Sequence, residues 1–566
     1  MENNNIINKL NRVNKFLNQK SGFSFWVWLI IITLAGVKLF LVGGQHEYAI
    51  GFAVHDDRLF INQALNLMHL DWLGEYSNMT LAKGPFYPMW IALNHALHIP
   101  LLVSEHLLYI AASVVLVLGL KPVFEKRRWP LMAIYIIVLF NPVSFANDPA
   151  TRVIREGIYQ PLTLLMAALF IGLALRMKEK PQRIFLWSLI AGFALSAFWL
   201  TREEGVWLSP LLAIMTVYSI YTVWKEKMQQ LKTKIFLIFL PFIILLFSIN
   251  LVSAINYYEY GIYNVVEFKA PQFLSAYGSL TRVKDGQWIK DVPVSTQKRL
   301  EIYPFSPAFS ELKPFLEGDL GKGWTATSIT NSEKDGVNEI KGGWFMWTFR
   351  DAVAQAGYYS NGKKAIEYYQ RLADEVNSAC DQKKLDCYPK RASMTSPWNS
   401  NYNKPMLDSV RESVVFISGL EGFTATPSES VGDNESLQLF GHITYADVAS
   451  KENSHFKLEI LNFITKLYRI IMPFILFLSA IIFFITFLKG KIIQNIPWII
   501  ALSLLGAIFA RIILLSIINV SAFHSIIILY LSPIYPLIFL FISLSLIPTT
   551  LWIEDKIISK NRKHEN

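Results

Sequence analysis

Long apolar runs recur along this chain, and they constrain its fold more than any other feature. Crossing a hydrocarbon core takes about 20 consecutive apolar residues. A mean hydropathy of +0.33 and a charged fraction of only 17% also place the chain in a bilayer. We therefore predict an all-α polytopic membrane protein with about ten spans, at residues 23–42, 101–121, 129–142, 158–176, 184–200, 205–224, 235–254, 466–488, 495–517 and 524–548.

Basic residues predict the orientation of these spans. The first run follows a polar arm, 1–22, and it is too long, and lacks the small-residue cleavage site, for a removable signal peptide. With the N-terminus inside, cytoplasmic segments collect most of the Lys and Arg that flank the spans, including the tail 549–566, as the positive-inside rule requires. The short outer loops hold only Arg58, Lys83, Arg152, Arg155 and Arg202. We expect a multi-pass protein of a cell membrane, the bacterial inner membrane, with both termini cytoplasmic. This pattern accounts for the net charge of +10, so nucleic acid is not an expected partner.

Between the arm and the tail, the spans divide the chain into three further parts. Residues 23–255 would form a seven-span catalytic module with an outer loop at 43–100, where the apolar stretch from Pro85 to His98 reads as a helix lying on the outer face. Residues 256–465 lack a spanning run and contain polar loops, which predicts a soluble outer domain, mainly α-helical or mixed. Within it, 351–379 reads as two helices broken at Asn361-Gly362. Residues 466–548 hold the last three spans.

Both cysteines of the chain, Cys380 and Cys387, lie in the predicted outer domain. A disulfide is the economical interpretation in an oxidising compartment. Two free thiols are the alternative, and a metal site lacks further ligands nearby.

An acidic pair in the first outer loop is the leading candidate for chemistry. His55, Asp56, Asp57 and Arg58 stand at the head of an amphipathic stretch. One of two adjacent carboxylates can accept a proton while the other fixes a neighbour or a cation. The alternative is a helix N-cap, which explains one aspartate but not both. We predict that Asp56 or Asp57 is catalytic, with His55 and Arg58 in support.

Cationic residues of the other outer segments predict a phosphate site. Lys83 stands in a Lys-Gly-Pro turn at the membrane boundary, where snorkelling is the rival interpretation. Arg152 and Arg155 are three residues apart, so on one helix face they would clamp a phosphate or pyrophosphate. Arg511, inside an apolar run, needs a carboxylate or an anionic head group. Arg202 of the third outer loop joins these cations. The charged neighbours that would support or neutralise them are Asp148, Glu156, Glu203 and Glu204.

This order of features resembles the GT-C superfamily of glycosyltransferases, and particularly its protein O-mannosyltransferase and lipid A aminoarabinose transferase branch. The motif-level likeness runs from about Val54 to Phe170. The resemblance implies a polyprenyl-phosphate sugar as donor and an outer-loop Asp, matched by Asp56 or Asp57, as base or acceptor-positioning group. The family's Lys-Pro-Pro-like turn is matched loosely by Lys83-Gly84-Pro85. The family pair is often Asp-Glu where this chain has Asp-Asp.

We therefore expect a transferase that passes a sugar from a polyprenyl-phosphate donor to an extracytoplasmic glycan, lipid or protein. Lys83, Arg152, Arg155, Arg202 and Arg511 would hold the leaving phosphate. No nucleotide-binding glycine fingerprint is present, and no cofactor is firmly expected, although the carboxylates could bind a divalent cation. The alternatives are a polytopic transporter or flippase, and an O-antigen ligase or polymerase for lipid-linked glycans.

Overall fold

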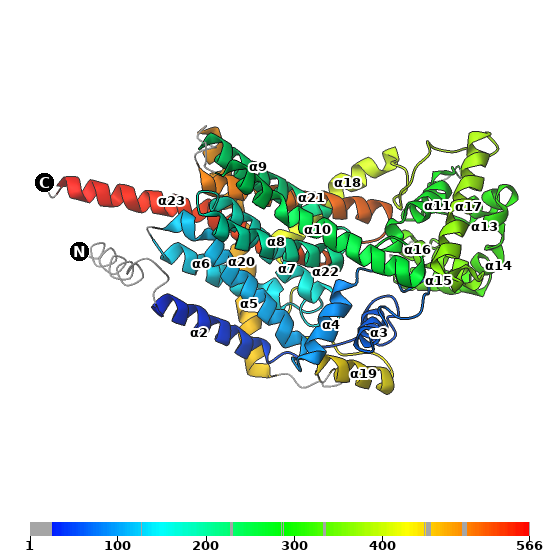
Figure 1. The fold of residues 1–566 in the computed structure, drawn as a ribbon, viewed down its shortest axis with the longest axis horizontal. Coiled ribbons are helices and arrows are strands. Elements are labelled where there is room, and N and C mark those ends of the chain that lie inside the picture. The colour runs from blue at the N-terminus through cyan, green and yellow to red at the C-terminus, as the bar shows by residue number, and fades with distance from the viewer. Residues whose placement is uncertain are drawn as a thin grey trace.

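A bundle of long apolar helices forms the body of the computed structural model (Figure 1), which describes residues 25–564 except 126, 227–229, 285, 287, 332–335, 447, 449–453 and 490–494. Nine helical stretches among these residues are long and apolar enough to cross a membrane. The chain is therefore a multi-pass membrane protein, all-α as predicted. The nine are Phe25–Val42 (α2), Leu101–Phe124 (α5 and η1), Glu156–Leu175 (α7), Pro181–Thr201 (α8), Gly205–Lys225 (η3 and α9), Leu231–Tyr260 (α10), His455–Leu488 (α20), Ile496–Ser521 (α21) and Ile528–Trp552 (α22, η8 and the start of α23).

The stretch expected to be the third span is shorter than predicted. Residues 129–142 contain α6, Trp129–Leu139, of only 11 residues. Even so, α5 carries the chain away from one end of the bundle and α6 returns it to that end. This is shown by Gln45, just after α2, which donates to the carbonyl of Phe145 at 2.8 Å. The loops after α2 and after α6 therefore meet at the same end.

The burial of the helices separates the centre of the bundle from its lipid-facing rim. Of the 18 most apolar consecutive residues in each helix, 89% are buried in α7, 22% in α10 and 11% in α20. The exposed face of α20 carries aromatic side chains such as Phe474 and Phe477. Such side chains are stable in contact with lipid, because only the buried face of the helix has to match its neighbours. The start of α7 thus lies in a fixed setting, which matters because Arg155 and Glu156 stand there.

The outer domain has a hydrophobic core of its own, built from side chains between Ala270 and Leu385. Helices α11 and α17 pack together in it. Asn361 caps α17 by accepting from the Lys364 N–H, so the predicted break at Asn361-Gly362 is the start of a helix. The elements are η4 (Glu267–Lys269), α11 (Pro271–Arg282), α12 (Thr296–Ile302), η5 (Tyr303–Phe305), α13 (Pro307–Ser310), α14 (Lys313–Leu316), α15 (Asp319–Thr330), α16 (Gly342–Gln355), η6 (Tyr358–Ser360) and α17 (Gly362–Asp381).

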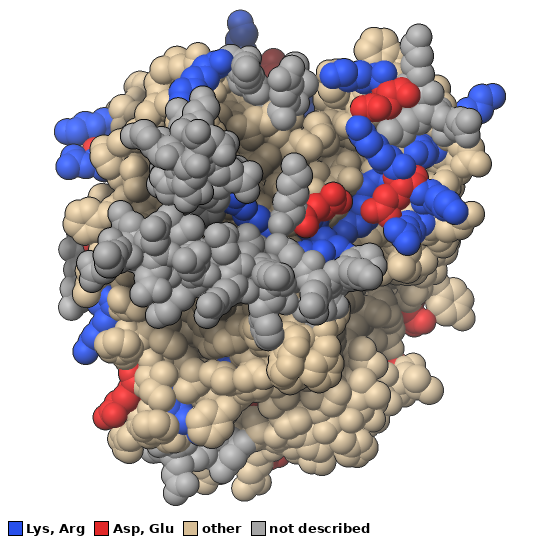
Figure 2. Space-filling model, turned by 90° about the vertical axis from the view of Figure 1, so that its left-hand side faces the viewer, with Lys and Arg blue, Asp and Glu red and all other residues tan. Residues whose placement is uncertain are grey.

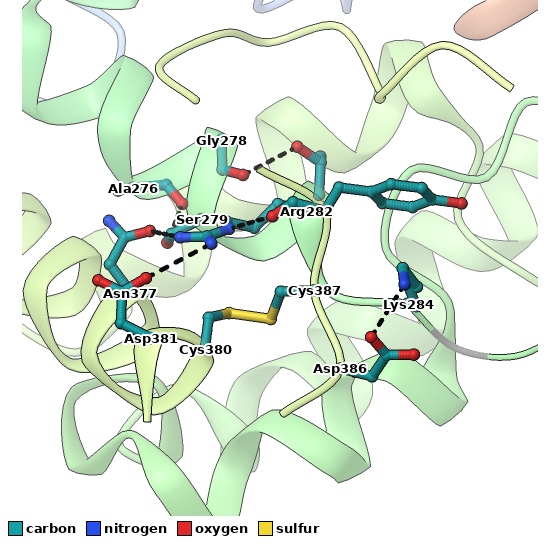
Figure 3. The surroundings of a disulfide bond; sticks show 12 residues. Ala276, Gly278, Ser279, Arg282, Lys284, Asn377, Cys380, Asp381, Asp386 and Cys387 are labelled. Carbon is teal, nitrogen blue, oxygen red and sulfur yellow. Dashed lines mark hydrogen bonds and ion pairs between the residues drawn. A yellow bond between two sulfur atoms is a disulfide. The ribbon is translucent and has the colours of Figure 1, made fainter. Parts of the chain in front are cut away.

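Cys380 and Cys387 form a disulfide at the end of α17, with Cα atoms 5.7 Å apart (Figure 3). Beside it, Arg282 at the end of α11 donates to the carbonyl of Tyr388 at 2.8 Å and to Asn377 Oδ1 at 2.7 Å. The disulfide and the arginine together fix the chain that leaves α17 against α11.

The remainder of the long outer segment does not stay in that domain. Helix α18 (Asn403–Gly419), preceded by η7 (Ser400–Tyr402), packs on α20 and α21, and α19 (Asn434–Thr444) packs on α4. Side chains of both helices, including Ile417 and Phe440, belong to the same core as the membrane helices. The segment 256–465 therefore consists of a helical domain followed by a strap that returns along the bundle.

Figure 1 places the outer domain at one end of the molecule and the start of α2 and the end of α23 (Tyr535–His564) at the other. Figure 2 views this second end and shows Lys and Arg gathered there with a few acids among them. They come from the turns between spans and include the ion pair of Lys178 with Glu226, 2.7 Å. The cytoplasmic position of this second end stays a prediction from the sequence. The predicted arm 1–22 lies outside the described residues, and residues 549–564 of the predicted tail 549–566 continue α23.

Candidate active site

Three segments far apart in the sequence come together at the outer end of the bundle. Tyr48, after α2, pairs with Arg152 in a parallel bridge, and Ile50 pairs with Val431 of the strap. The N–H of Tyr48 donates to the carbonyl of Thr151 at 2.9 Å, and the N–H of Gly51 donates to Val431 at 2.7 Å. The first and second outer loops and the strap are thereby held in one register just before the acidic pair.

Asp57 is a buried structural anchor. It is the first residue of α3 (Asp57–Met68) and is 0% exposed. Arg152 binds it with two nitrogens, Nε at 3.1 Å from both carboxylate oxygens and Nη2 at 2.6 Å from Oδ2, and the N–H of Ile50 donates to Oδ1 at 3.0 Å. A carboxylate with these partners and no access to solvent cannot take a proton from a substrate without breaking the junction of the two loops.

Asp56 is the accessible member of the pair. It stands at the N-cap position of α3 but makes no side-chain capping bond, and 42% of its side chain is exposed. Its partner is the ammonium of Lys83, which also lies over the Phe60 ring, 5.1 Å from its centroid. Burial of the surroundings opposes ionisation of Asp56, but Lys83 outweighs it and lowers the pKa of Asp56 to about 2. Asp56 is thus an ionised, reachable carboxylate held by a single lysine.

The turn after Lys83 fits the third outer loop. A Cβ at Gly84 would collide with the carbonyl oxygen of Leu200, so only glycine lets the loop approach the end of α8. The N–H of Gly84 donates to Glu203 Oε1 at 3.0 Å. The following helix, α4 (Phe86–Ala96), begins at the position expected for the outer-face helix. Lys83 is therefore fixed by its backbone as well as by its ion pair.

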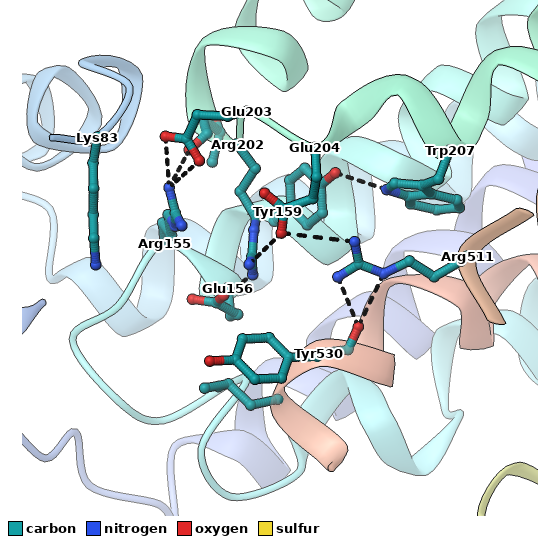
Figure 4. A network of polar contacts seen from close by, with 12 residues as sticks. Lys83, Arg155, Glu156, Tyr159, Arg202, Glu203, Glu204, Trp207, Arg511 and Tyr530 are labelled. Carbon is teal, nitrogen blue, oxygen red and sulfur yellow. Dashed lines mark hydrogen bonds and ion pairs between the residues drawn. The ribbon is translucent and has the colours of Figure 1, made fainter. Parts of the chain in front are cut away.

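Arg155 and Glu203 join the second and third outer loops. Arg155 Nη1 lies 3.1 Å from both carboxylate oxygens of Glu203 and donates to the Thr201 carbonyl at 3.3 Å. The outer domain contributes Lys269, whose ammonium donates to the backbone carbonyl of Glu203. Figure 4 shows Arg155 beside the extended side chain of Lys83. These two cations face the same region of the site.

Deeper in the bundle, arginines and glutamates alternate (Figure 4). Arg202 pairs with both Glu156 and Glu204, and Arg511 Nη1 lies 3.7 Å from Glu204 Oε1. Arg511 also donates to the carbonyl of Tyr530 from Nη2 at 2.9 Å, and it is 0% exposed. The network connects α7, α8, α21 and the start of the last span, so each buried cation has a carboxylate or carbonyl partner, as the cost of burying charge requires.

The structure separates some residues that the sequence analysis grouped. Arg152 and Arg155 do not share a helix face, so the predicted clamp is wrong: α7 begins only at Glu156, and the two arginines bind different carboxylates. Arg58 is exposed, and Asp148 accepts from the Tyr48 hydroxyl. His55 points to the outer domain, its ring centroid 4.4 Å from that of Trp347, and burial lowers its pKa to about 4.

A buried ion pair within the outer domain positions the two residues that hydrogen-bond to the first outer loop. Arg350 of α16 and Glu267 are both 0% exposed and lie 3.1 Å apart. Arg350 Nε donates to the carbonyl of Asn78 at 3.0 Å. The N–H of Glu267 donates to the carbonyl of Leu81 at 2.8 Å. The domain therefore sits directly on the loop that carries Asp56 and Lys83.

Sequence reasoning missed several charged groups near the site. Lys269 belongs to a linker with no motif. Glu105 stands alone in an apolar run, which could have marked it, and Glu47 follows α2. Glu47 is 2% exposed, and burial raises its pKa to about 8. No group of three or more potential ligands that could hold a metal ion occurs in the described part of the chain.

No family model matches the chain, and no curated protein matches it. Two solved structures do. ArnT from Cupriavidus metallidurans in the apo state is 11% identical with a TM-score of 0.28, and the same protein bound to undecaprenyl phosphate is 10% identical with a TM-score of 0.29. Each match covers 88% of this chain and 77% of the other. Both are structures from the transferase branch that the sequence resembles. At TM-scores this low, the likeness carries no argument about this chain's site.

Proposed function

We propose that the chain is a membrane glycosyltransferase that moves a sugar from a polyprenyl-phosphate donor to an extracytoplasmic acceptor, with Asp56 as the base. The observation that carries the proposal is the pair of Asp56 and Lys83. An accessible carboxylate is held by one lysine, at the outer end of a membrane bundle, beside Arg155. A base next to a cation that can bind phosphate is what transfer from a lipid phosphate needs.

Donor binding would change the state of Asp56. In the structure, Lys83 keeps the pKa of Asp56 near 2, which makes the carboxylate a weak base. A phosphate that enters between Lys83 and Arg155 takes over the ammonium and releases Asp56. The pKa of the freed carboxylate then rises, because its surroundings are partly desolvated and now hold a negative phosphate. Donor binding thus prepares the base.

Transfer of the sugar then forms one bond at the anomeric carbon and breaks another. The acceptor hydroxyl oxygen forms a bond to the anomeric carbon of the donor, and its proton passes to Asp56. The bond from that carbon to the phosphate oxygen breaks, and the electron pair leaves with polyprenyl phosphate. Lys83 and Arg155 stabilise the charge that develops on the leaving oxygen. Asp57 and the deeper network of Arg202, Glu204 and Arg511 keep these groups in position.

Release of polyprenyl phosphate from labelled polyprenyl-phosphate sugars tests this proposal. We expect release by the wild type, a loss of at least about a hundredfold in Asp56→Asn, as for removal of a general base, and a similar loss in Lys83→Met. The exposed Asp71 of the same loop supplies a matched control, Asp71→Asn, with unchanged release. Full activity of Asp56→Asn would refute the mechanism. Movement of intact donor across a vesicle membrane without bond cleavage would favour a flippase instead.

A further inference from the structure

Aromatic side chains of the outer domain lie beside the candidate base. Trp324 of α15 and Trp344 of α16 are half-buried, with ring centroids 5.8 Å apart and planes inclined by 35°. The ring of His55 lies 5.4 Å from that of Trp324 and 4.4 Å from that of Trp347. Because His55 directly precedes Asp56, this aromatic cluster (Trp324, Trp344, Trp347 and His55) adjoins the carboxylate.

Hydrogen-bonding groups stand at the edge of the aromatic cluster. Asp351 accepts from Trp324 Nε1 at 2.9 Å and from Asn78 Nδ2 at 2.6 Å. Asp351 and Asn78 are both only half-buried. Each carboxylate oxygen of Asp351 has one donor and can accept another. The outer domain and the first outer loop thus present aromatic faces and polar acceptors together.

We propose that the aromatic cluster binds a sugar ring of the acceptor, so that the acceptor is a carbohydrate. A pyranose has an apolar face of C–H groups, which packs on aromatic rings, and hydroxyls around its rim, which bind carboxylate and amide groups. An acyl chain would remove water from Asp351 without offering it a donor, which is costly. The proposal rests on the proposed function, because the bound sugar would present its hydroxyl to Asp56.

The buried ion pair of Arg350 and Glu267 holds the aromatic cluster and Asp351 in place. It holds α16, which carries Trp344, Trp347 and Asp351, against the loop that carries Asn78. Figure 1 shows α15 and α16 on the side of the outer domain that faces α3. The sugar would therefore bind a preformed site, which lowers the conformational cost of binding.

Binding to arrays tests the proposal without knowledge of the donor. Full-length protein in detergent is applied to an array of bacterial surface oligosaccharides and to an array of Ser/Thr peptides. We expect oligosaccharide binding that weakens roughly tenfold in Trp324→Ala and in Trp344→Ala, as for loss of an aromatic contact. Trp324→Phe and Trp344→Phe should retain most of the binding. Trp398, 53% exposed in the same outer segment, provides the matched control Trp398→Ala.

Three outcomes would overturn the proposal: no oligosaccharide bound by the wild type, binding that survives both alanine variants, or binding of peptides alone. Release of polyprenyl phosphate to water in the absence of acceptor is measured on the wild type and on the control Trp398→Ala, and both should show it. Failure of release in the wild type would refute the proposed function. Failure of the array result with release intact would refute only the carbohydrate site.

Discussion

Asp56 and Asp57 are adjacent, yet their substitution by asparagine should change the stability of the fold by very different amounts. Asp57→Asn removes the partner of Arg152 inside a junction that is 0% exposed at the carboxylate. Breaking a buried ion pair by removal of one charge costs about 3–5 kcal/mol of stability, and the 15% exposure of the Arg152 side chain places this variant toward the lower end. Asp57→Asn should therefore be poorly folded, and its loss of activity should follow from its loss of structure.

Asp56→Asn should disturb the fold less than Asp57→Asn, because water reaches the Asp56 side of its ion pair, although the substitution leaves the buried ammonium of Lys83 without its carboxylate. The shift of the Asp56 pKa from its ordinary value of 3.8 to about 2 corresponds to about 2.4 kcal/mol. Because 42% of the side chain is exposed, solvent screening reduces this to about 1 kcal/mol or less. Since the folded-state pKa is depressed, this contribution is present above pH 3.8 and is lost as the pH falls through 2.

Unfolding of the purified variants by SDS titration in mild detergent at pH 7 measures the difference. Asp71→Asn, the exposed control, should lie within about 0.5 kcal/mol of the wild type. We expect the stability of Asp56→Asn to lie between that of the control and that of Asp57→Asn, with Asp57→Asn clearly the least stable. The reasoning would be refuted by an Asp56→Asn variant as unstable as Asp57→Asn, or by a fully stable Asp57→Asn.

Three further perturbations test other parts of the structure. Arg350→Met leaves Glu267 buried without its cation and should lower stability by about 3–5 kcal/mol. Limited proteolysis should then cut earlier between the outer domain and the bundle. An unchanged digestion pattern would contradict this role of Arg350. Glu47→Gln should gain stability relative to the wild type as the pH rises from 4.5 to about 8, because ionisation of the buried Glu47, whose pKa is raised, destabilises the wild-type native state. Thermal unfolding at pH 5 and pH 9 measures the difference in stability between the two proteins. The same difference at both pH values would argue against a buried neutral acid. Cys380→Ser with Cys387→Ser should lower outer-domain stability by about 2–3 kcal/mol, the value for a short closed loop, as dithiothreitol should in the wild type only; equal sensitivity of both proteins to the reductant would contradict it.

Sequence reasoning found the spans because their signal is local. A run of about 20 apolar residues identifies itself without reference to the rest of the chain. It placed α6 correctly but overestimated its length, since the apolar run around it continues into the short 3-10 helix η2 (Pro142–Phe145). The strap was missed for a different reason: α18 is amphipathic, and nothing in its own sequence says that its apolar face meets α21 rather than the outer domain.

The candidate site was predicted as a set of residues but not as a set of pairs. Charges near a membrane need partners, which identified Lys83, Arg202 and Arg511. Which carboxylate each cation meets depends on the folding of distant loops, so the sequence alone does not say which of Asp56 and Asp57 is buried. Lys269 has no sequence signal, because a lysine in a polar linker is usually solvated.

Binding of undecaprenyl phosphate to the purified wild type, Asp56→Asn and Lys83→Met, measured by native mass spectrometry, tests the central claim most directly. If the lipid phosphate and Asp56 compete for Lys83, Lys83→Met should bind the lipid at least about tenfold more weakly, as for loss of a charge-assisted contact. Asp56→Asn should bind it as tightly as the wild type or more tightly, although it cannot complete transfer. Weaker binding by Asp56→Asn, or unchanged binding by Lys83→Met, would contradict the account.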